Sequence, residues 1–464
     1  MQHNIESPDT YYSPWEKAFG KILTPFEEFL HKQTTGGIVL LVCTVIALIL
    51  ANGPLADEYD AILHAHVSIN VGTWRIDHTV HHWVNDGLMA LFFFVVGLEI
   101  KREVLVGDLR DIRSATLPIV AAMGGMILPA LVYLSINSSG PNATGWGIPM
   151  ATDIAFAVGV LALLGNRVPK SLYTFLVALA IVDDLGAVSV IAIFYTEQIV
   201  WQEIVIAAVI FAGLITLNRT GIRHPLPYFI LGIFMWMAFL ESGVHATIAG
   251  VLTALTVPYR PKLAPIKFAE HIQQLLERFG DRLENNQTSI INYQRQRAIV
   301  HAIEHGIQKV ESPLQRLEHG FHPVVAFGIV PIFALVNAGI PISGNSIVTV
   351  FSDKVGLGII LGLLLGKLLG IAGVSLLTIK LGIAKFPTNC TTTHIIGTAL
   401  IAGIGFTMSI FIADLAFKGQ EDVLLSAKTG ILCASFIAGV GGYLLLRFAS
   451  KPEEKRGEVV DEAA

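Results

Sequence analysis

Long apolar segments recur along most of this 464-residue chain and constrain its fold more than any other feature. An α-helix needs about 20 apolar residues to cross a hydrocarbon layer roughly 30 Å thick. Charged residues make up 14% of the chain, against about 25% in soluble domains. We therefore expect an all-α polytopic membrane protein with twelve spans, at about 35–52, 82–102, 114–136, 149–164, 171–195, 203–218, 225–240, 243–257, 322–338, 355–379, 393–416 and 425–447.

The distribution of lysine and arginine supports this number of spans, because cytoplasmic loops carry an excess of both residues. With twelve spans, the side that holds both termini contains 26 of the 31 lysines and arginines, and the other side contains four. The remaining one, Lys367, lies inside a span. We expect cytoplasmic tails at 1–34 and 448–464, spans 1–8 at 35–257, a cytoplasmic loop at 258–321 and spans 9–12 at 322–447.

Two segments outside the spans have patterns of their own. The outer loop "HAHVSINVGTWRID" (64–77) alternates apolar residues on either side of Gly72, which predicts a short β-hairpin. The cytoplasmic stretch 264–312 carries two apolar stripes at helical spacing, which predict a pair of amphipathic helices.

Four charged residues interrupt the apolar spans near mid-depth. Asp183 and Asp184 are adjacent in the fifth span, Asp153 follows Thr152 in the fourth, and Lys367 lies in the middle of the tenth. Each costs roughly 2.5–3.5 kcal/mol at the centre of a membrane helix, so such residues are functional by default. A structural ion pair between Lys367 and one aspartate accounts for only two of the four. The surplus of negative charge favours a hydrated cation site.

The order of the spans also suggests an internal repeat. Spans three to five and ten to twelve have similar lengths, and the middle member of each is interrupted, at 149–153 and at Gly403 and Gly405. Matched interrupted spans in two halves of a chain indicate the substrate site of a transporter.

Seven motifs then occur in an order that resembles one known family, the NhaA sodium/proton antiporters. The similarity extends over about residues 34–447, and it implies inverted repeats with two discontinuous helices, spans 4 and 11, that cross. The insertion at 264–312 and an extra acidic residue, Asp414, depart from the family pattern. In chain order the motifs are "GLEIKREV", "ATDIAFAVGVLALLG", "ALAIVDDLGA", "SGVHATIAGV", "RLEHGFHP", "LLLGKLLG" and "GIGFTMSIFIA".

The resemblance implies a secondary antiporter that exchanges Na⁺ or Li⁺ for H⁺, driven by the proton gradient and serving sodium and pH homeostasis. Na⁺ and H⁺ would compete for Asp183 and Asp184, with Thr152 and Asp153 at the crossing of the broken helices. Asp153 would offset the positive ends of the half-helices, and Lys367 the negative ends. No cofactor and no enzymatic reaction are implied.

By the same resemblance, pH is sensed by charged residues at the cytoplasmic ends of spans two and nine. An ordinary interfacial charge network is an equally good interpretation of these residues, and His245 alone is a typical packing histidine. The resemblance further implies a homodimer that forms through the 64–77 hairpin, in a bacterial inner membrane. The candidate residues for pH sensing are Glu99, Arg102, Glu103, Glu318, His319, His322 and His245.

Three other functions fit parts of the pattern. An intramembrane aspartyl protease would carry an aspartate directly after the Gly-x-Gly turn, where this chain has Phe406. A retinal protein with Lys367 as its Schiff-base lysine is a poor match to twelve spans and adjacent aspartates. A passive cation channel is the nearest alternative, and it would conduct without obligatory proton movement.

Overall fold

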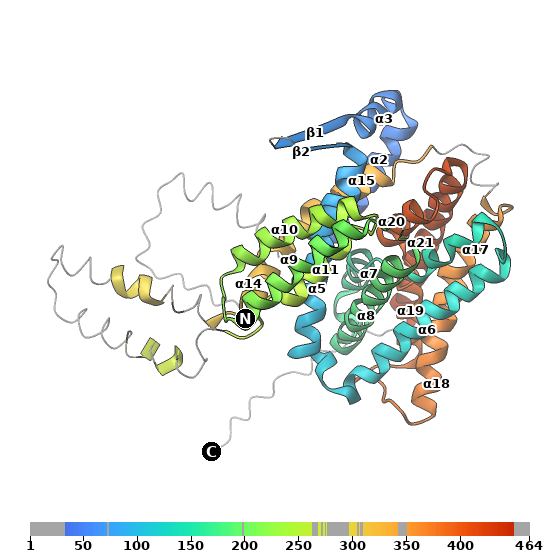
Figure 1. Ribbon diagram of the computed structural model, residues 1–464. Helices are drawn as coiled ribbons and strands as arrows, with labels where there is room; N and C mark the ends of the chain where they lie inside the picture. Colours follow the sequence, from blue (N-terminus) through green and yellow to red (C-terminus); the bar gives the residue numbers. More distant parts are fainter. Residues whose placement is uncertain are drawn as a thin grey trace, which may run out of the picture.

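In the computed structural model the chain is a mostly helical, polytopic membrane protein (Figure 1). The described residues are 33–71, 74–196, 199–261, 310–341 and 350–449, with short pieces at 268–270, 272–273, 275, 297–303 and 306. Within them, nine helices are long and apolar enough to cross a membrane, or ten if one bent pair counts as a single span. The predicted helical pair at 264–312 lies largely outside the described residues.

The first part of the chain contains a small outer sheet and most of the long helices. Its elements are α2 (Gln33–Asn52), α3 (Ala56–His64), β1 (His66–Val71), β2 (Trp74–Thr79), α4 (Val80–His82), η1 (Trp83–Leu88), α5 (Met89–Leu105), η2 (Asp108–Arg110), α6 (Ile112–Ile136), η3 (Pro141–Met150), α7 (Ile154–Ala162), η4 (Gly165–Arg167), α8 (Lys170–Phe194), α9 (Trp201–Arg219), α10 (Pro225–Ser242) and α11 (Thr247–Thr256).

The second part begins after the loop predicted at 258–321. Its elements are α14 (Pro313–Val324), η5 (Val325–Ile329), α15 (Val330–Asn337), α17 (Lys354–Leu361), η6 (Gly362–Gly366), η7 (Leu368–Gly373), α18 (Val374–Lys380), α19 (Thr392–Ile401), α20 (Phe406–Ala416) and α21 (Glu421–Ala449). The segments η1, η5, η6 and η7 are π-helical turns inside longer helices, whereas η2, η3 and η4 are 3₁₀ helices.

The outer surface of the bundle is strongly apolar. Phe436, Ile193 and Val209 are 73%, 71% and 67% exposed. A soluble protein would bury most such side chains, whereas a membrane helix presents them to lipid and satisfies its backbone polar groups internally.

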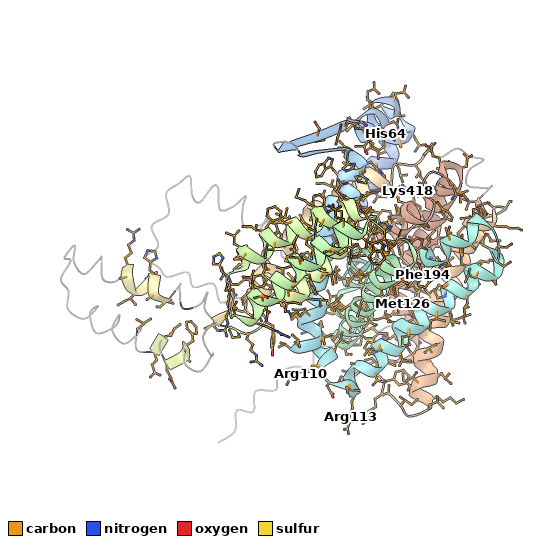
Figure 2. All side chains as sticks on the ribbon, in the orientation of Figure 1. His64, Arg110, Arg113, Met126, Phe194 and Lys418 are labelled. Carbon is orange, nitrogen blue, oxygen red and sulfur yellow. The ribbon has the colours of Figure 1, made fainter. Side chains whose placement is uncertain are left out.

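The two ends of the bundle differ in structure. Figure 2 shows His64 and Lys418 at the end that carries the β1–β2 hairpin, and Arg110 and Arg113 at the opposite end. The hairpin is antiparallel, pairs His66 with Thr79, and extends from the bundle beside α3 (Figure 1). The Tyr59 hydroxyl of α3 donates to Leu335 O of α15 at 2.6 Å, and burial raises the pKa of Tyr59 to about 12. The helix α3, which leads into the hairpin, is therefore attached to α15 through the neutral hydroxyl of Tyr59.

Close helix packing surrounds the tenth predicted span. A Cβ on Gly370 would collide with the carbonyl oxygen of Gly124 in α6, and a Cβ on Gly124 would collide with that of Gly370. Small residues allow membrane helices to approach this closely. The contact fixes η6 and η7, and with them Lys367 between the two π turns, against α6.

Candidate functional site

Two breaks in the helices contact each other inside the bundle. Residues 151–153 separate η3 from α7, and residues 402–405 separate α19 from α20, which are bent by 46°. The Asp153 amide donates to Ile404 O at 2.7 Å, and Thr152 Oγ1 donates to Ala402 O at 2.8 Å. The free carbonyls of one break are thus satisfied by polar groups of the other.

Asp153 caps two half-helices at once. Its Oδ1 accepts from the Phe156 amide in the first turn of α7 at 2.9 Å. Its Oδ2 accepts from the amide and hydroxyl of Thr407, in the first turn of α20, at 3.1 and 2.5 Å. A carboxylate near a helix N-terminus is stabilised by the free amides and by the helix dipole. One buried aspartate therefore serves both positive helix ends.

Lys367 lies next to this junction and joins it to α8. Its Nζ donates to Thr152 Oγ1 at 2.9 Å and to Asp183 Oδ2 at 2.8 Å, and its side chain is fully buried. Because the Thr152 hydroxyl also donates to the carbonyl of Ala402, directly after α19, Lys367 places positive charge beside the negative end of that half-helix. The aspartate that pairs with Lys367 is therefore Asp183.

Asp183 and Asp184 lie in the middle of α8 and are 1% and 2% exposed. Adjacent helical residues point about 100° apart, and only Asp183 pairs with Lys367. Asp183 Oδ1 is buried without a hydrogen-bond partner among the described residues. Asp184 lies within electrostatic reach of Asp183, Glu99 and Asp153, and no ion pair of Asp184 occurs in the part of the chain that the structure describes. Carboxylate oxygens are therefore left for a ligand.

Gly403 and Gly405 are required for space rather than for an unusual backbone conformation. Neither has a positive φ. A Cβ on Gly403 would lie 2.6 Å from Leu363 O of η6, and one on Gly405 would collide with the Ser409 hydroxyl. These glycines let the break approach the π-helical segment that precedes Lys367.

Sequence reasoning missed three hydroxyl residues and the π turns. The Thr407 hydroxyl donates to Asp153 Oδ2. Ser409 Oγ donates to Ile148 O at 2.8 Å, and Ser435 Oγ accepts from the Phe406 amide at 3.1 Å. A signal for Thr407 and Ser409 was present, because both follow the predicted break within one turn. Ser435 lies in α21, and no local pattern indicates its contact.

Comparison with known proteins identifies the family. The family model described as "Na+/H+ antiporter 1" matches residues 27–446. The chain belongs to this family. It is 53% identical over 432 residues to the Na(+)/H(+) antiporter NhaA 1 of Saccharophagus degradans, which covers 93% of both chains. It is 51% identical over 441 residues to the Na(+)/H(+) antiporter NhaA of Sulfurimonas denitrificans, which covers 95% of this chain and 99% of the relative.

Six of the seven candidate pH-sensing residues of this Na⁺/H⁺ antiporter family member lie together. Arg102 pairs with Glu103 at 2.9 Å and with Glu318 at 3.3 Å, so α5 and α14 are joined by ion pairs. Glu99 lies within electrostatic reach of Glu318, Arg102 and Glu103, and His319 and His322 lie within reach of Arg102 or Glu318. Since Glu99 also acts on Asp184, the cluster is electrostatically connected to the buried aspartates.

The structure does not bring His245 to this cluster. His245 Nε2 lies 2.7 Å from Tyr195 O, directly after α8 ends. The side chain also acts electrostatically on Asp86, in η1. His245 is thus at the other end of α8 from Lys170, whereas the cluster lies near the ends of α5 and α14.

The arrangement suits a small hard cation rather than a tightly held transition metal. In the described part of the chain, no group of three or more His, Cys, Asp or Glu side chains is placed to hold a metal ion. Asp183 and Asp184 instead offer oxygens that bind hard cations. Their neighbour Lys367 places a positive charge against one of these carboxylates, that of Asp183.

We expect the shared capping of Asp153 to contribute measurably to stability. Thr407→Val removes the hydroxyl that donates to Asp153 but keeps the shape of the side chain, whereas Thr407→Ser keeps the donor. A hydrogen bond to a charged group contributes about 1.5–3 kcal/mol. The Val variant in detergent should therefore unfold at a lower temperature than the Ser variant and the parent. Equal melting of the Val and Ser variants would contradict this role of the hydroxyl.

Proposed function

We propose that this protein exchanges Na⁺ for H⁺ across the membrane as a secondary antiporter, driven by the proton gradient. One observation carries the proposal: two adjacent buried carboxylates meet a double helix break, and only Asp183 is paired with Lys367. The chain is about 50% identical to two proteins named Na⁺/H⁺ antiporters over nearly its whole length. These relatives are transporters, so we assign no enzymatic reaction.

We propose that Na⁺ and H⁺ compete for Asp183 and Asp184. Na⁺ requires deprotonated carboxylates, so protonation expels the cation and cation binding releases protons. Li⁺, a second hard cation, would bind the same oxygens. Lys367 occupies Asp183 Oδ2 when no cation is bound, which stabilises the empty site.

Asp153 and Thr152 hold the binding region in place under this proposal. The broken spans, η3 with α7 and α19 with α20, cross where the two breaks contact each other. Asp153 offsets the two helix N-termini, and Lys367 offsets the C-terminal carbonyls through Thr152. The half-helices can then tilt while the junction stays neutral and hydrogen-bonded.

We propose twelve spans with both termini in the cytoplasm of a bacterial cell and the protein in its inner membrane. Two helices add to the ten candidate spans and bring the number to twelve. One is α11, which has ten residues, and the other is α5, which η1 and α4 extend to Val80–Leu105. In each proposed repeat the first span contacts the last: α6 contacts α8, and α17 contacts α21. The tails at 1–34 and 448–464 and the loop at 258–321 would be cytoplasmic. A reporter enzyme that is active only outside the cytoplasm can be fused to the C-terminus. Activity of this reporter would contradict the proposed topology.

We expect Asp184→Asn to abolish exchange, because the variant removes the charge that Na⁺ and H⁺ share. Everted vesicles first build a proton gradient by respiration. Na⁺, Li⁺ or K⁺ is then added, and the collapse of the proton gradient is followed by the fluorescence of a pH-sensitive dye at several pH values. Asp57→Asn, at an exposed position of α3, is the matched control and should behave like the parent.

Two outcomes would overturn the proposed mechanism. Undiminished exchange by Asp184→Asn would show that the carboxylate is structural. Cation flux in the parent without proton movement would favour a passive channel.

We propose that the cytoplasmic cluster adjusts activity to pH, with activation at alkaline pH. Histidine titrates near neutrality, and the cluster contains two histidines beside the Arg102–Glu318 ion pair. Glu99 carries the effect toward Asp184, because it acts on both the cluster and the aspartate. His245 would act separately, through Tyr195 at the end of α8.

We expect Glu318→Gln to shift the pH profile toward acid. With one negative charge removed, the cluster holds its protons less strongly, so activation begins at lower pH. The maximal rate should change little, since Glu318 does not contact the buried aspartates. Glu311→Gln, exposed and seven residues earlier, is the control. An unchanged profile measured in the same vesicles would refute the regulatory role.

We propose that two copies associate through the β1–β2 hairpin. The hairpin extends from the bundle, and Tyr59 anchors the adjacent α3 to α15, so the paired strands are available to a second copy (Figure 1). Removing the hairpin should convert a dimer to a monomer in light scattering of the detergent-solubilised protein. A dimer that survives the deletion would contradict this assignment.

A further inference from the structure

Asp414, which departs from the family pattern, belongs to a buried polar cluster far along α20 from the helix break. Its Oδ1 accepts from Lys428 Nζ of α21 at 2.8 Å, and the two side chains are 9% and 11% exposed. Its Oδ2 accepts from Asn85 Nδ2 of η1 at 3.3 Å. Both carboxylate oxygens are therefore occupied by partners from other elements.

The cluster continues into α15 and α4. Asn337 Nδ2 donates to Asn85 Oδ1 at 2.8 Å, and Asn85 Nδ2 lies 3.3 Å from Asn337 Oδ1, so the two amides form a reciprocal pair. His81 Nε2 lies 3.0 Å from the same Asn337 oxygen. The outer polar layer, defined as Asp414, Lys428, Asn85, Asn337 and His81, joins four separate parts of the fold.

A second layer lies directly beneath the first. Phe93 of α5, Phe333 of α15 and Phe411 of α20 are at most 1% exposed, and the Phe411 ring centroid is 5.8 Å from that of Phe93 and 6.2 Å from that of Phe333. Each phenylalanine lies on the same helix as one member of the polar layer, three to eight residues away and toward the interior.

The two layers lie on the outer side of the binding region. Phe411 is one helical turn beyond Thr407, which shares Asp153, and Asp414 is almost one turn further along α20. Phe93 lies between Asn85 and Glu99 along the helix that continues from η1 into α5. On the cytoplasmic side, by contrast, polar Glu99 lies between Asp184 and the Arg102 cluster.

We propose that the Asp414–Lys428 ion pair and the Asn85–Asn337 pair form an outer gate that must separate whenever the aspartates face outward. The inference rests on the proposed function, because only a transporter needs to open this side. A buried ion pair suits such a gate, since desolvation of the two charges offsets much of their attraction. The paired, dry state and the separated, hydrated state are then close in free energy.

Two variants should move the gate in opposite directions. Asp414→Asn leaves the Lys428 charge buried and uncompensated in the closed state, so the open state is favoured. The double variant Asp414→Leu/Lys428→Met removes both desolvation penalties and favours the closed state. Loss of folding cannot produce opposite effects of this kind.

The experiment measures the apparent KM for Na⁺ from each face, in right-side-out and everted vesicles. Apparent affinity is reduced by the fraction of molecules in the competent state, so Asp414→Asn should lower the outer KM by about threefold or more and raise the inner KM. The double variant should raise the outer KM and lower the inner one. Ser426→Ala is the control, since Ser426 Oγ of α21 contacts Asp353 instead and lies outside both layers.

The outcomes separate this inference from the proposed function. If the parent does not exchange Na⁺ for H⁺, the proposed function fails. If the parent exchanges but both variants leave the ratio of outer to inner KM unchanged, or shift it in the same direction, the gate assignment is wrong. Should one variant not be produced in folded form, the sign of the shift in the other still decides.

Discussion

The Asp153 carboxylate connects the two helix breaks on which the rest of the site depends. Two half-helices that end inside a membrane leave amides and carbonyls that no water can satisfy, each at a cost of several kcal/mol. Asp153 accepts from α7 through one oxygen and from α20 through the other, while Thr152 and the Asp153 amide satisfy carbonyls of the opposite break. The irregular backbone is therefore stable only as a pair, and neither break would persist without the other.

The hydrogen bonds that hold the two helix breaks are separate from the Lys367–Asp183 ion pair. Lys367 spans the distance from Thr152 to Asp183, and its long side chain lies between two π turns that pack through Gly370 against α6. Displacing Lys367 from Asp183 leaves the capping by Asp153 intact, because the two sets of hydrogen bonds share no atom of the carboxylates. The charges that a cation must displace are thus separate from those that hold the helices.

The sequence predicts much of this arrangement for a physical reason. Charged residues in apolar spans are costly, so Asp153, Asp183, Asp184 and Lys367 stand out without any structure. Their depth predicts that Lys367 pairs with one aspartate, but not with which one. Ser435 does not stand out, because hydroxyl residues are common in membrane helices and its contact with Phe406, 29 residues away, has no local pattern. The π turns were not predicted: η1 directly precedes α5, and η6 and η7 lie within the tenth predicted span, where hydropathy does not distinguish them from an α-helix.

The two sides of the site differ in how their buried polar groups are satisfied. On the side away from the hairpin, Glu99 and the Arg102 ion pairs continue the polar environment of Asp184. Toward the hairpin, three phenylalanines separate the aspartates from the next polar layer, in which the oxygens of Asp414 and the amide pair are satisfied by protein groups. The two sides of the site therefore differ in polarity: charged groups lie on one side and aromatic rings on the other. In the proposed transport cycle, separation of these paired buried groups costs free energy each time the aspartates face outward. The strength of the pairing then sets the population of the outward-facing state.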